Sequence, residues 1–419
     1  MNVLFIYAAP NQKKHIRYGF SLNIAYAASI LKEQNHFCSF LDLSCNDITI
    51  EGLVNKICVD KIDVVAVEFD SFALKRSDNS SSGRNILEMT KKYTKAYTIA
   101  FGFECIMEKK EKTYADITIL DDIIYCIESA INSLSEGKKD YCIRNYEYDS
   151  LPLPDRKLIE SEKYYGDNNI ATLVQTSKGC LNTCTFCQRQ GWQNYHVEHS
   201  IDYVKSEFEY LSLNGYKNIW ITDENFTFNL VRAKKILQML IETQLTKNMK
   251  IAISSWSRID KEFLELSRRA GISVISMGIE SANKEVLDFY KKHINLSEVK
   301  ELITYANRLG IFTVGNFIIG APIENVYMIN KTFSYIDEVG FDQVNIKILD
   351  YMIGSDLYES LLIKDENHYF SCKENGLGLL SMNELLELKN TFIEQYIRKN
   401  NDRLKNKIQE FGPPYYSMN

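Results

Sequence analysis

Short apolar segments alternate with helix-period segments through the first third of the chain. In one intervening segment Ile24, Ala27, Ala28 and Leu31 follow the i, i+3, i+4, i+7 spacing of an amphipathic helix. The predicted strands are 3–8, 40–43, 64–69, 97–101 and 117–120. Such alternation predicts an open parallel sheet with helices on both faces. We therefore expect a Rossmann-like doubly wound domain over 1–140.

A second alternation begins near residue 170 and predicts a different α/β architecture. Helix-period segments separate six predicted strands, at 171–177, 218–222, 250–254, 274–277, 312–319 and 343–348. Six βα units predict a partial (β/α)6 TIM-like barrel over 170–355, with its chemistry at the carboxyl ends of the strands.

The remaining segments predict connections and an appendage. The segment 141–169 is charged and contains Pro152 and Pro154, which favours a linker. Residues 80–83, Ser-Ser-Ser-Gly, predict a short flexible loop. After residue 355 the pattern is helical, with Ser381 as the expected N-cap, so 356–419 is predicted to be a C-terminal helical region.

Composition narrows the class of protein. The chain has 419 residues, of which 45% are hydrophobic, enough for two globular units without stabilising metals or disulfides. A net charge of -6 argues against a dedicated nucleic-acid binder, which would carry a basic face. No apolar run approaches the roughly 18 residues that span a bilayer, so we expect no membrane association and a cytoplasmic location.

Three of the ten cysteines are clustered. Cys180, Cys184 and Cys187 have the spacing C-x3-C-x2-C in a loop after the first predicted barrel strand. Three thiolates so placed can hold three irons of a cubane cluster and leave the fourth iron without a protein ligand. The alternatives are a tetrahedral zinc site, with His196 or His199 as fourth ligand, and unreactive thiols.

This cysteine spacing, with Phe186 before the last cysteine, resembles the signature of the radical S-adenosylmethionine (SAM) superfamily. The resemblance implies that Cys180, Cys184 and Cys187 bind a [4Fe-4S] cluster whose open iron chelates SAM, with Phe186 in the cofactor site. It further implies reductive cleavage of SAM to a 5′-deoxyadenosyl radical, with electrons from a small flavodoxin- or ferredoxin-type protein.

Two further segments match the positions at which the superfamily binds the amino-acid part of SAM. Asp223 and Glu224 lie in Thr-Asp-Glu-Asn-Phe after the second barrel strand. The resemblance implies that Glu224 binds the SAM amino group, with Asp223 as the alternative. Arg258, after the third strand, matches the position that pairs with the SAM carboxylate, where a guanidinium suits bidentate binding.

The nucleoside part of SAM has its own matching segments. Glu280 and Ser281, in Gly-Ile-Glu-Ser, match the ribose-contacting segment. Gly315 and Gly320 match the segment that borders the adenine, where the absence of a side chain lets the backbone approach the ring. The resemblance covers roughly 170 to 355.

The beginning of the chain resembles the cobalamin-binding domain that is often fused to radical SAM barrels, with two departures. None of the six histidines lies in a D-x-H-x-x-G element, so cobalamin ligated by histidine is not expected. Gly102-Phe103 replaces the usual Gly-Gly pair, and Leu120-Asp-Asp-Ile123 replaces a glycine-rich turn, so side chains would crowd a bound corrin. The alternatives are functional cobalamin binding and a degenerate domain that contacts substrate or partner, and these departures favour the second.

Hydrogen abstraction from a carbon of a peptide or natural-product substrate is accordingly the expected reaction, with peptide epimerisation as one form. An epimerase needs a thiol to return hydrogen, and Cys372 is the candidate, with an incidental surface thiol as the alternative. The alternative reaction is cobalamin-dependent C-methylation. A non-enzymatic iron–sulfur or interaction protein is the third class, which leaves the SAM-binding segments without a purpose.

Overall fold

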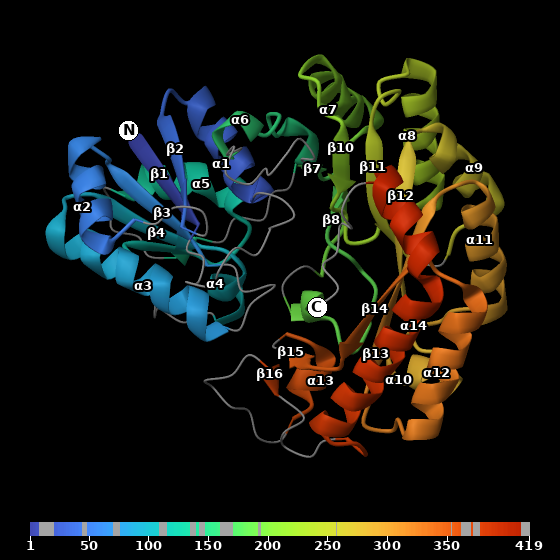
Figure 1. Cartoon of the computed structure of the whole chain (residues 1–419). Coiled ribbons are helices and arrows are strands. Elements are labelled where there is room, and N and C mark those ends of the chain that lie inside the picture. Colours follow the sequence, from blue (N-terminus) through green and yellow to red (C-terminus); the bar gives the residue numbers. More distant parts are fainter. Residues whose placement is uncertain are drawn as a thin grey trace. The chain divides into compact units, whose positions relative to one another are not determined.

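The computed structural model describes residues 1–7, 21–43, 48–69, 76–108, 115–134, 140–141, 147–159, 171–191, 194–256, 258–352, 354–361, 370–371 and 378–411. The chain folds as two compact units, Met1–Asn168 and Asn169–Asn419 (Figure 1). Each unit has its own parallel sheet and its own hydrophobic core.

The first unit contains the predicted doubly wound sheet. Its six parallel strands have the order β2-β1-β3-β4-β5-β6. The strands are β1 (Asn2–Tyr7), β2 (Phe37–Asp42), β3 (Val64–Glu68), β4 (Tyr97–Phe101), β5 (Ile117–Ile119) and β6 (Asp140–Tyr141). The strand order reverses between β1 and β3, and open α/β sheets bind ligands at the carboxyl ends of the strands at such a point.

Helices cover both faces of this sheet. They are α1 (Leu22–Glu33), α2 (Ile50–Val59), α3 (Arg76–Tyr93), α4 (Phe103–Glu108), α5 (Ile123–Ser133) and α6 (Arg156–Ile159). Leu53 of α2 and Leu87 of α3 belong to the same core as Val65 and Val67 of β3. β3 is buried at every position, as expected for a strand covered on both faces.

The loop expected at 80–83 is instead part of α3. A Cβ atom at Gly83 would lie 2.7 Å from the ring of Phe69, which directly follows β3. The glycine therefore lets the helix approach the end of the strand, and this packing outweighs its low helix propensity.

Part of the segment expected as a linker packs on the first unit. It contains a 3-10 turn (Tyr148–Ser150) and α6, which contacts α1 and β2. Ser29 of α1 donates to the carbonyl of Leu153, and Lys32 forms an ion pair with Asp155. Arg156 is fully buried, so residues 147–159 are an integral part of this unit.

The second unit contains the predicted partial barrel. Its parallel strands have the order β14-β13-β12-β11-β10-β7. They are β7 (Ala171–Val174), β10 (Asn218–Ile221), β11 (Lys250–Ser255), β12 (Ile272–Glu280), β13 (Phe312–Ile319) and β14 (Gln343–Ile348). The helices between them are α7 (Ile201–Leu213), α8 (Leu230–Thr243), α9 (Lys261–Arg269), α10 (Lys284–Phe289), α11 (Leu296–Arg308) and α12 (Val326–Val339).

Two short antiparallel pairs and a terminal helix complete the second unit. The pairs are β8 (Ser177–Lys178) with β9 (Val197–Glu198), and β15 (Tyr351–Met352) with β16 (Phe370–Ser371). The remaining helices are a 3-10 turn (Gln188–Gly191), α13 (Asp356–Glu359) and α14 (Met382–Phe411). Among the described residues, every helix is too short or too polar to span a bilayer.

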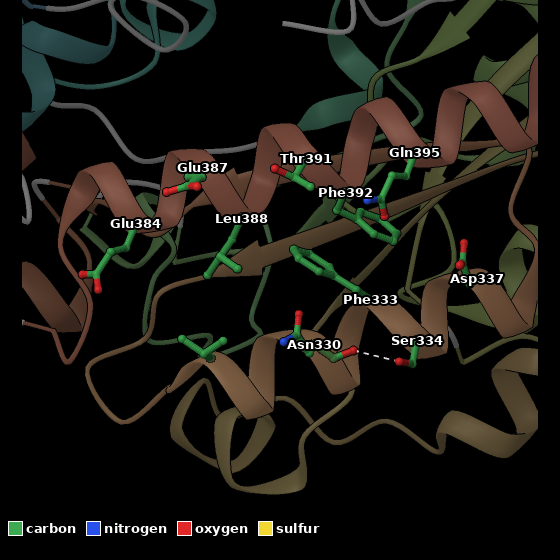
Figure 2. A pocket seen from close by; sticks show the side chains of 11 residues that line it. Asn330, Phe333, Ser334, Asp337, Glu384, Glu387, Leu388, Thr391, Phe392 and Gln395 are labelled. Carbon is green, nitrogen blue, oxygen red and sulfur yellow. Dashed lines mark hydrogen bonds between the residues drawn. The ribbon is translucent and has the colours of Figure 1, made fainter.

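Helix α14 packs beside α12 over the barrel core. Phe333 of α12 and Phe392 of α14 stack with their ring centroids 4.2 Å apart (Figure 2). A groove of about 670 Å³ lies between the two helices, and Figure 2 shows Glu384, Glu387 and Asp337 along it. Since Leu385, Phe392 and Tyr396 belong to the barrel core, α14 is part of the fold of this unit.

Candidate active site

The three clustered cysteines lie on one loop that is closed at its base by a two-stranded ribbon. The loop leaves β8 at Gly179 and returns to β9 after Tyr195 and His196. Gly179 has φ +84°, and a Cβ atom there would lie 2.0 Å from the carbonyl oxygen of Tyr195. Only glycine therefore allows the two ends of the loop to approach this closely.

The three thiols lie near one another and are partly removed from water. Cys184 is 6% exposed, whereas Cys180 and Cys187 are half-buried. Burial raises the pKa of Cys184 to about 12, and the positive charge of Lys292 opposes this shift. Burial also raises the pKa of Cys187, which the charge of Arg189 opposes. The charge of Cys180 also raises the pKa of each of these two thiols.

Hydrogen bonds fix the turn of this loop that contains the last two cysteines. The backbone N–H of Thr185 donates to the carbonyl of Tyr290, and its hydroxyl donates to the carbonyl of Phe289. The ring of Phe186 packs edge-to-face on Tyr290, with centroids 5.0 Å apart. Leu357 closes the turn from a third side by donating to the carbonyl of Thr185.

The two histidines that could complete a zinc site are engaged elsewhere. His196 Nδ1 lies 3.1 Å from the carbonyl oxygen of Gly179, and its Nε2 lies 3.0 Å from Glu198 Oε1. His199 is 1% exposed and stacks on Tyr203. Within the described ranges, no three His, Cys, Asp or Glu side chains are close enough to share one metal ion. An iron–sulfur cubane differs from a zinc site because it binds each thiolate to a separate iron. The three cysteines therefore fit a cluster better than a zinc ion.

Of the two acidic residues after β10, Glu224 faces the cysteine loop and Asp223 is structural. Glu224 Oε2 accepts from the backbone N–H of Gly179 at 2.9 Å, and Oε1 pairs with Arg189 at 2.6 Å. Asp223 is 1% exposed and accepts from Thr176 and Ser177. Burial raises the pKa of Asp223 and these hydrogen bonds oppose the shift. The geometry thus favours Glu224 over Asp223 as the residue available to a ligand.

A buried ion pair lies at the end of β12. Glu280 has φ +70°, unusual for a non-glycine residue, and its carboxylate lies 2.5 Å from Lys292 Nζ. Lys292 Nζ also lies 4.8 Å from the ring centroid of Trp256, and Arg258 Cζ lies 5.6 Å from the same ring. Arg258 is exposed, whereas Lys292 influences both Cys184 and Cys187. The structure therefore offers two cations beside Trp256, of which Lys292 is buried in an ion pair and Arg258 is exposed.

Of the predicted nucleoside-binding residues, Gly320 forms a backbone hydrogen bond, whereas Ser281 and Gly315 have packing roles. Gly320 has φ +84° and donates its N–H to buried Glu324 at 2.5 Å. Ser281 is fully buried and accepts from the backbone of Asn283. At Gly315, a Cβ atom would lie 2.8 Å from the ring of Phe317. Core packing thus accounts for Gly315, and hydrogen bonds with Asn283 and Thr332 account for the buried hydroxyl of Ser281.

One predicted residue of this site lies outside the described part of the chain, and two residues near the cysteines were not predicted. Cys372, the predicted hydrogen donor, lies outside the described residues. Lys292 and Arg189 were not predicted, although Arg189 lies two residues after Cys187. A lysine directly after an apolar helix end is the only sequence signal for Lys292, and it is a common one.

Comparisons with known proteins identify the class. Residues 174–336 match the radical SAM superfamily. An uncharacterized methyltransferase of Pyrococcus horikoshii is 23% identical over 367 residues, covering 81% of this chain and 77% of its relative. The cytidylyl-2-hydroxyethylphosphonate methyltransferase of Streptomyces wedmorensis is 27% identical over 277 residues, 59% of this chain and 51% of that protein. The radical SAM methyltransferase TsrM from Kitasatospora setae, solved with cobalamin and a [4Fe-4S] cluster, matches with a TM-score of 0.72 and 15% identity, over 85% of this chain and 76% of that one.

The match to the radical SAM superfamily, together with the α/β barrel and its cysteine loop, identifies an enzyme class that uses a [4Fe-4S] cluster and SAM. Residues 174–336 are thus a radical SAM domain, and the chain is similar to the branch of that superfamily with an N-terminal cobalamin-binding-type domain. Enzymes of this superfamily require a reductant and a substrate. The sequence expectation of hydrogen abstraction without methyl transfer is less well supported than its alternative, because the relatives are mostly methyltransferases.

Proposed function

We propose that this chain is a cobalamin-dependent radical SAM methyltransferase that acts on carbon of a small molecule or peptide. The observation that carries the barrel half of this proposal is a single loop with three cysteines that Glu224 contacts through Gly179 and Arg189 at the carboxyl edge of the sheet. Methyl transfer is favoured by relatives whose names describe methyltransferases.

The side chains of the barrel match the parts of SAM. Cys180, Cys184 and Cys187 would hold the cluster. Glu224 would accept from the SAM ammonium, and Lys292 would bind the SAM carboxylate together with Arg258, since a charge-assisted pair is strong in a partly buried site. When bound, the cluster supplies the electron that cleaves SAM, and cobalamin supplies the carrier of the methyl group.

The part of the site proposed for adenine is the backbone turn after β13. Glu324 is fully buried and accepts from the N–H groups of Gly320 and Ala321, which fixes the turn after β13. Ala321, Tyr290 and Tyr351 belong to one apolar cluster, against which Phe186 packs. This cluster would exclude water from the adenine ring.

The two turns that the sequence predicted to crowd a corrin are packed within the first unit. At Gly102, with φ +110°, a Cβ atom would lie 2.5 Å from the carbonyl oxygen of Phe69, so this glycine serves close backbone packing. Phe103 is 5% exposed and therefore does not project from the turn into solvent. Asp122 caps α5, and Asp121 accepts from the N–H of Asp122, so both carboxylates are used within the turn. The expected crowding of a corrin at these two turns is thus not supported.

Anaerobic reconstitution with iron, sulfide and hydroxocobalamin tests this function. We expect about four irons and one corrinoid per chain, and with SAM, reductant and substrate we expect one S-adenosylhomocysteine per methylated product. The electron donor would be a flavodoxin- or ferredoxin-type protein. 5′-Deoxyadenosine without matched S-adenosylhomocysteine, together with no retained corrinoid, would return the assignment to hydrogen abstraction. Stoichiometric zinc without iron uptake would overturn the cluster itself.

A further inference from the structure

Arg232 on α8 lies outside the segments that match SAM-binding positions, and it joins the two ends of the ribbon at the base of the cysteine loop. Its Nη2 donates to the carbonyl of Thr176 at 2.8 Å and to the carbonyl of His199 at 2.6 Å. Thr176 directly precedes β8 and His199 directly follows β9. One guanidinium group therefore bridges the entry and the exit of the ribbon.

A second set of contacts extends from Arg232 to the first residue of the loop. Arg232 Nε lies 3.5 Å from Glu198 Oε2, and Glu198 Oε1 lies 3.0 Å from His196 Nε2. His196 Nδ1 in turn lies 3.1 Å from the carbonyl oxygen of Gly179, directly before Cys180. Helix α8 is thus connected to the loop through three side chains in series.

The same ribbon is also held by Asp223. Its carboxylate accepts from the backbone N–H of Thr176 at 2.7 Å and from the Thr176 hydroxyl at 2.6 Å. Arg232 and Asp223 therefore both bind Thr176, and their side chains are largely or fully buried. We call Arg232, Glu198, His196, Thr176 and Asp223 the strap.

The ribbon itself is short, because β8 and β9 pair at two positions, Ser177 with Glu198 and Lys178 with Val197. The contacts of Arg232, Glu198 and His196 therefore add to the constraints at the two ends of the cysteine loop.

We propose that Arg232 is a positioning residue that holds the cysteine loop in the form that accepts the iron–sulfur cluster. This inference rests on the proposed cluster site and adds a residue to it. An arginine suits the task because its planar fork presents several N–H donors in fixed directions, which a lysine ammonium on a flexible stem does not.

Cluster retention in Arg232→Lys tests the inference, because this variant keeps the charge and loses the fork. The matched control is Lys234→Ala on the same helix, since Lys234 pairs with Asp260 and Glu262 of the following loop and helix. Iron and sulfide per chain are measured after anaerobic reconstitution, followed by the rate of iron release to a ferrous chelator. Outer-shell partners of metal ligands typically contribute 10- to 100-fold to metal affinity. We expect release from Arg232→Lys to be at least about tenfold faster than from the wild-type chain and from Lys234→Ala.

A second variant covers the case in which Arg232→Lys fails to fold, which circular dichroism of the iron-free chain would show. Glu198→Ala removes the carboxylate that connects Arg232 to His196 and leaves both carbonyl bonds of Arg232 available, so we expect an intermediate rate of iron release. Wild-type release rates in the folded variants would overturn the role of Arg232 alone. A wild-type chain that binds no iron would instead overturn the proposed function.

Discussion

At the scale of single residues, Gly179 is the position where the cysteine loop tolerates the least change. In Gly179→Ala the new methyl group would meet the carbonyl oxygen of Tyr195, and the backbone would also be held at a positive φ. Gly215 offers a matched control, because it has φ +75° and a Cβ atom there would have no neighbour within 4 Å.

We expect Gly215→Ala to cost about 1–2 kcal/mol, the cost of the left-handed conformation, and to leave the cluster in place. Gly179→Ala should cost more and lose most of its iron, because the two ends of the loop must separate. Urea-induced unfolding and iron analysis measure both effects. Equal costs and full iron content in both variants would contradict this account.

Variants of the Lys292–Glu280 ion pair distinguish an effect on the stability of the fold from an effect on SAM binding. The two side chains are 3% and 9% exposed, so Lys292→Met leaves a carboxylate buried without its partner. Breaking a buried pair in this way costs about 3–5 kcal/mol, whereas removing both charges costs much less.

We therefore expect Lys292→Met to lower the free energy of unfolding by about 3–5 kcal/mol and the double variant Lys292→Met/Glu280→Gln to recover most of that loss. Neither variant should bind SAM as the wild-type chain does, because the cation is absent from both. Denaturant unfolding and calorimetric titration with SAM measure the two quantities. Normal SAM affinity in the double variant would remove Lys292 from the SAM site.

The sequence could identify those site residues whose signal is local. The spacing of Cys180, Cys184 and Cys187 is a chemical pattern in itself, and Glu224 follows a strand end. Lys292 could not be identified, because its meaning depends on Glu280 and on thiols more than a hundred residues earlier in the chain. The ordering of Glu224 over Asp223 as the ligand stays a prediction that the geometry favours.

At the scale of elements, the strands with uninterrupted apolar segments were predicted most accurately. The expected strands 97–101, 312–319 and 343–348 have the bounds of β4, β13 and β14. The expected strand 171–177 is instead divided into β7 and β8, because the backbone of Thr176 bonds to the Asp223 carboxylate and leaves the sheet. No local pattern reveals such a contact between side chain and backbone.

The docking of α14 on α12 depends on the stacked rings of Phe333 and Phe392 (Figure 2). Phe392 is 8% exposed, and truncation of a buried phenylalanine to alanine typically costs about 3–5 kcal/mol. Leu386, on the same helix and 39% exposed, provides the control.

We expect Phe392→Ala to lower the free energy of unfolding of the second unit by about 3–5 kcal/mol, and Leu386→Ala to change it by less than about 0.5 kcal/mol. Both are measured by denaturant unfolding followed by circular dichroism. A loss below about 1 kcal/mol in Phe392→Ala would indicate that α14 contributes little to the core.

At the scale of the whole molecule, the sequence predicted two α/β units and their types, whereas the reaction depended on relatives. The choice between methyl transfer and hydrogen abstraction rests on what the first unit binds, and no motif there is decisive. Gly102-Phe103 looked obstructive because sequence gives the size of a side chain and not its direction. Burial of Phe103 within the unit supplies the missing information.

The strap has a consequence for how this chain can vary. Arg232 holds the ribbon through the carbonyl groups of Thr176 and His199, and every amino acid has such a carbonyl. Substitutions at His199 therefore preserve one half of the bridge, whereas Arg232 has no substitute with the same fork. The form of the cysteine loop thus depends on Arg232, which lies on a helix distant from the loop in the sequence. A search restricted to the cysteine motif would not find this residue.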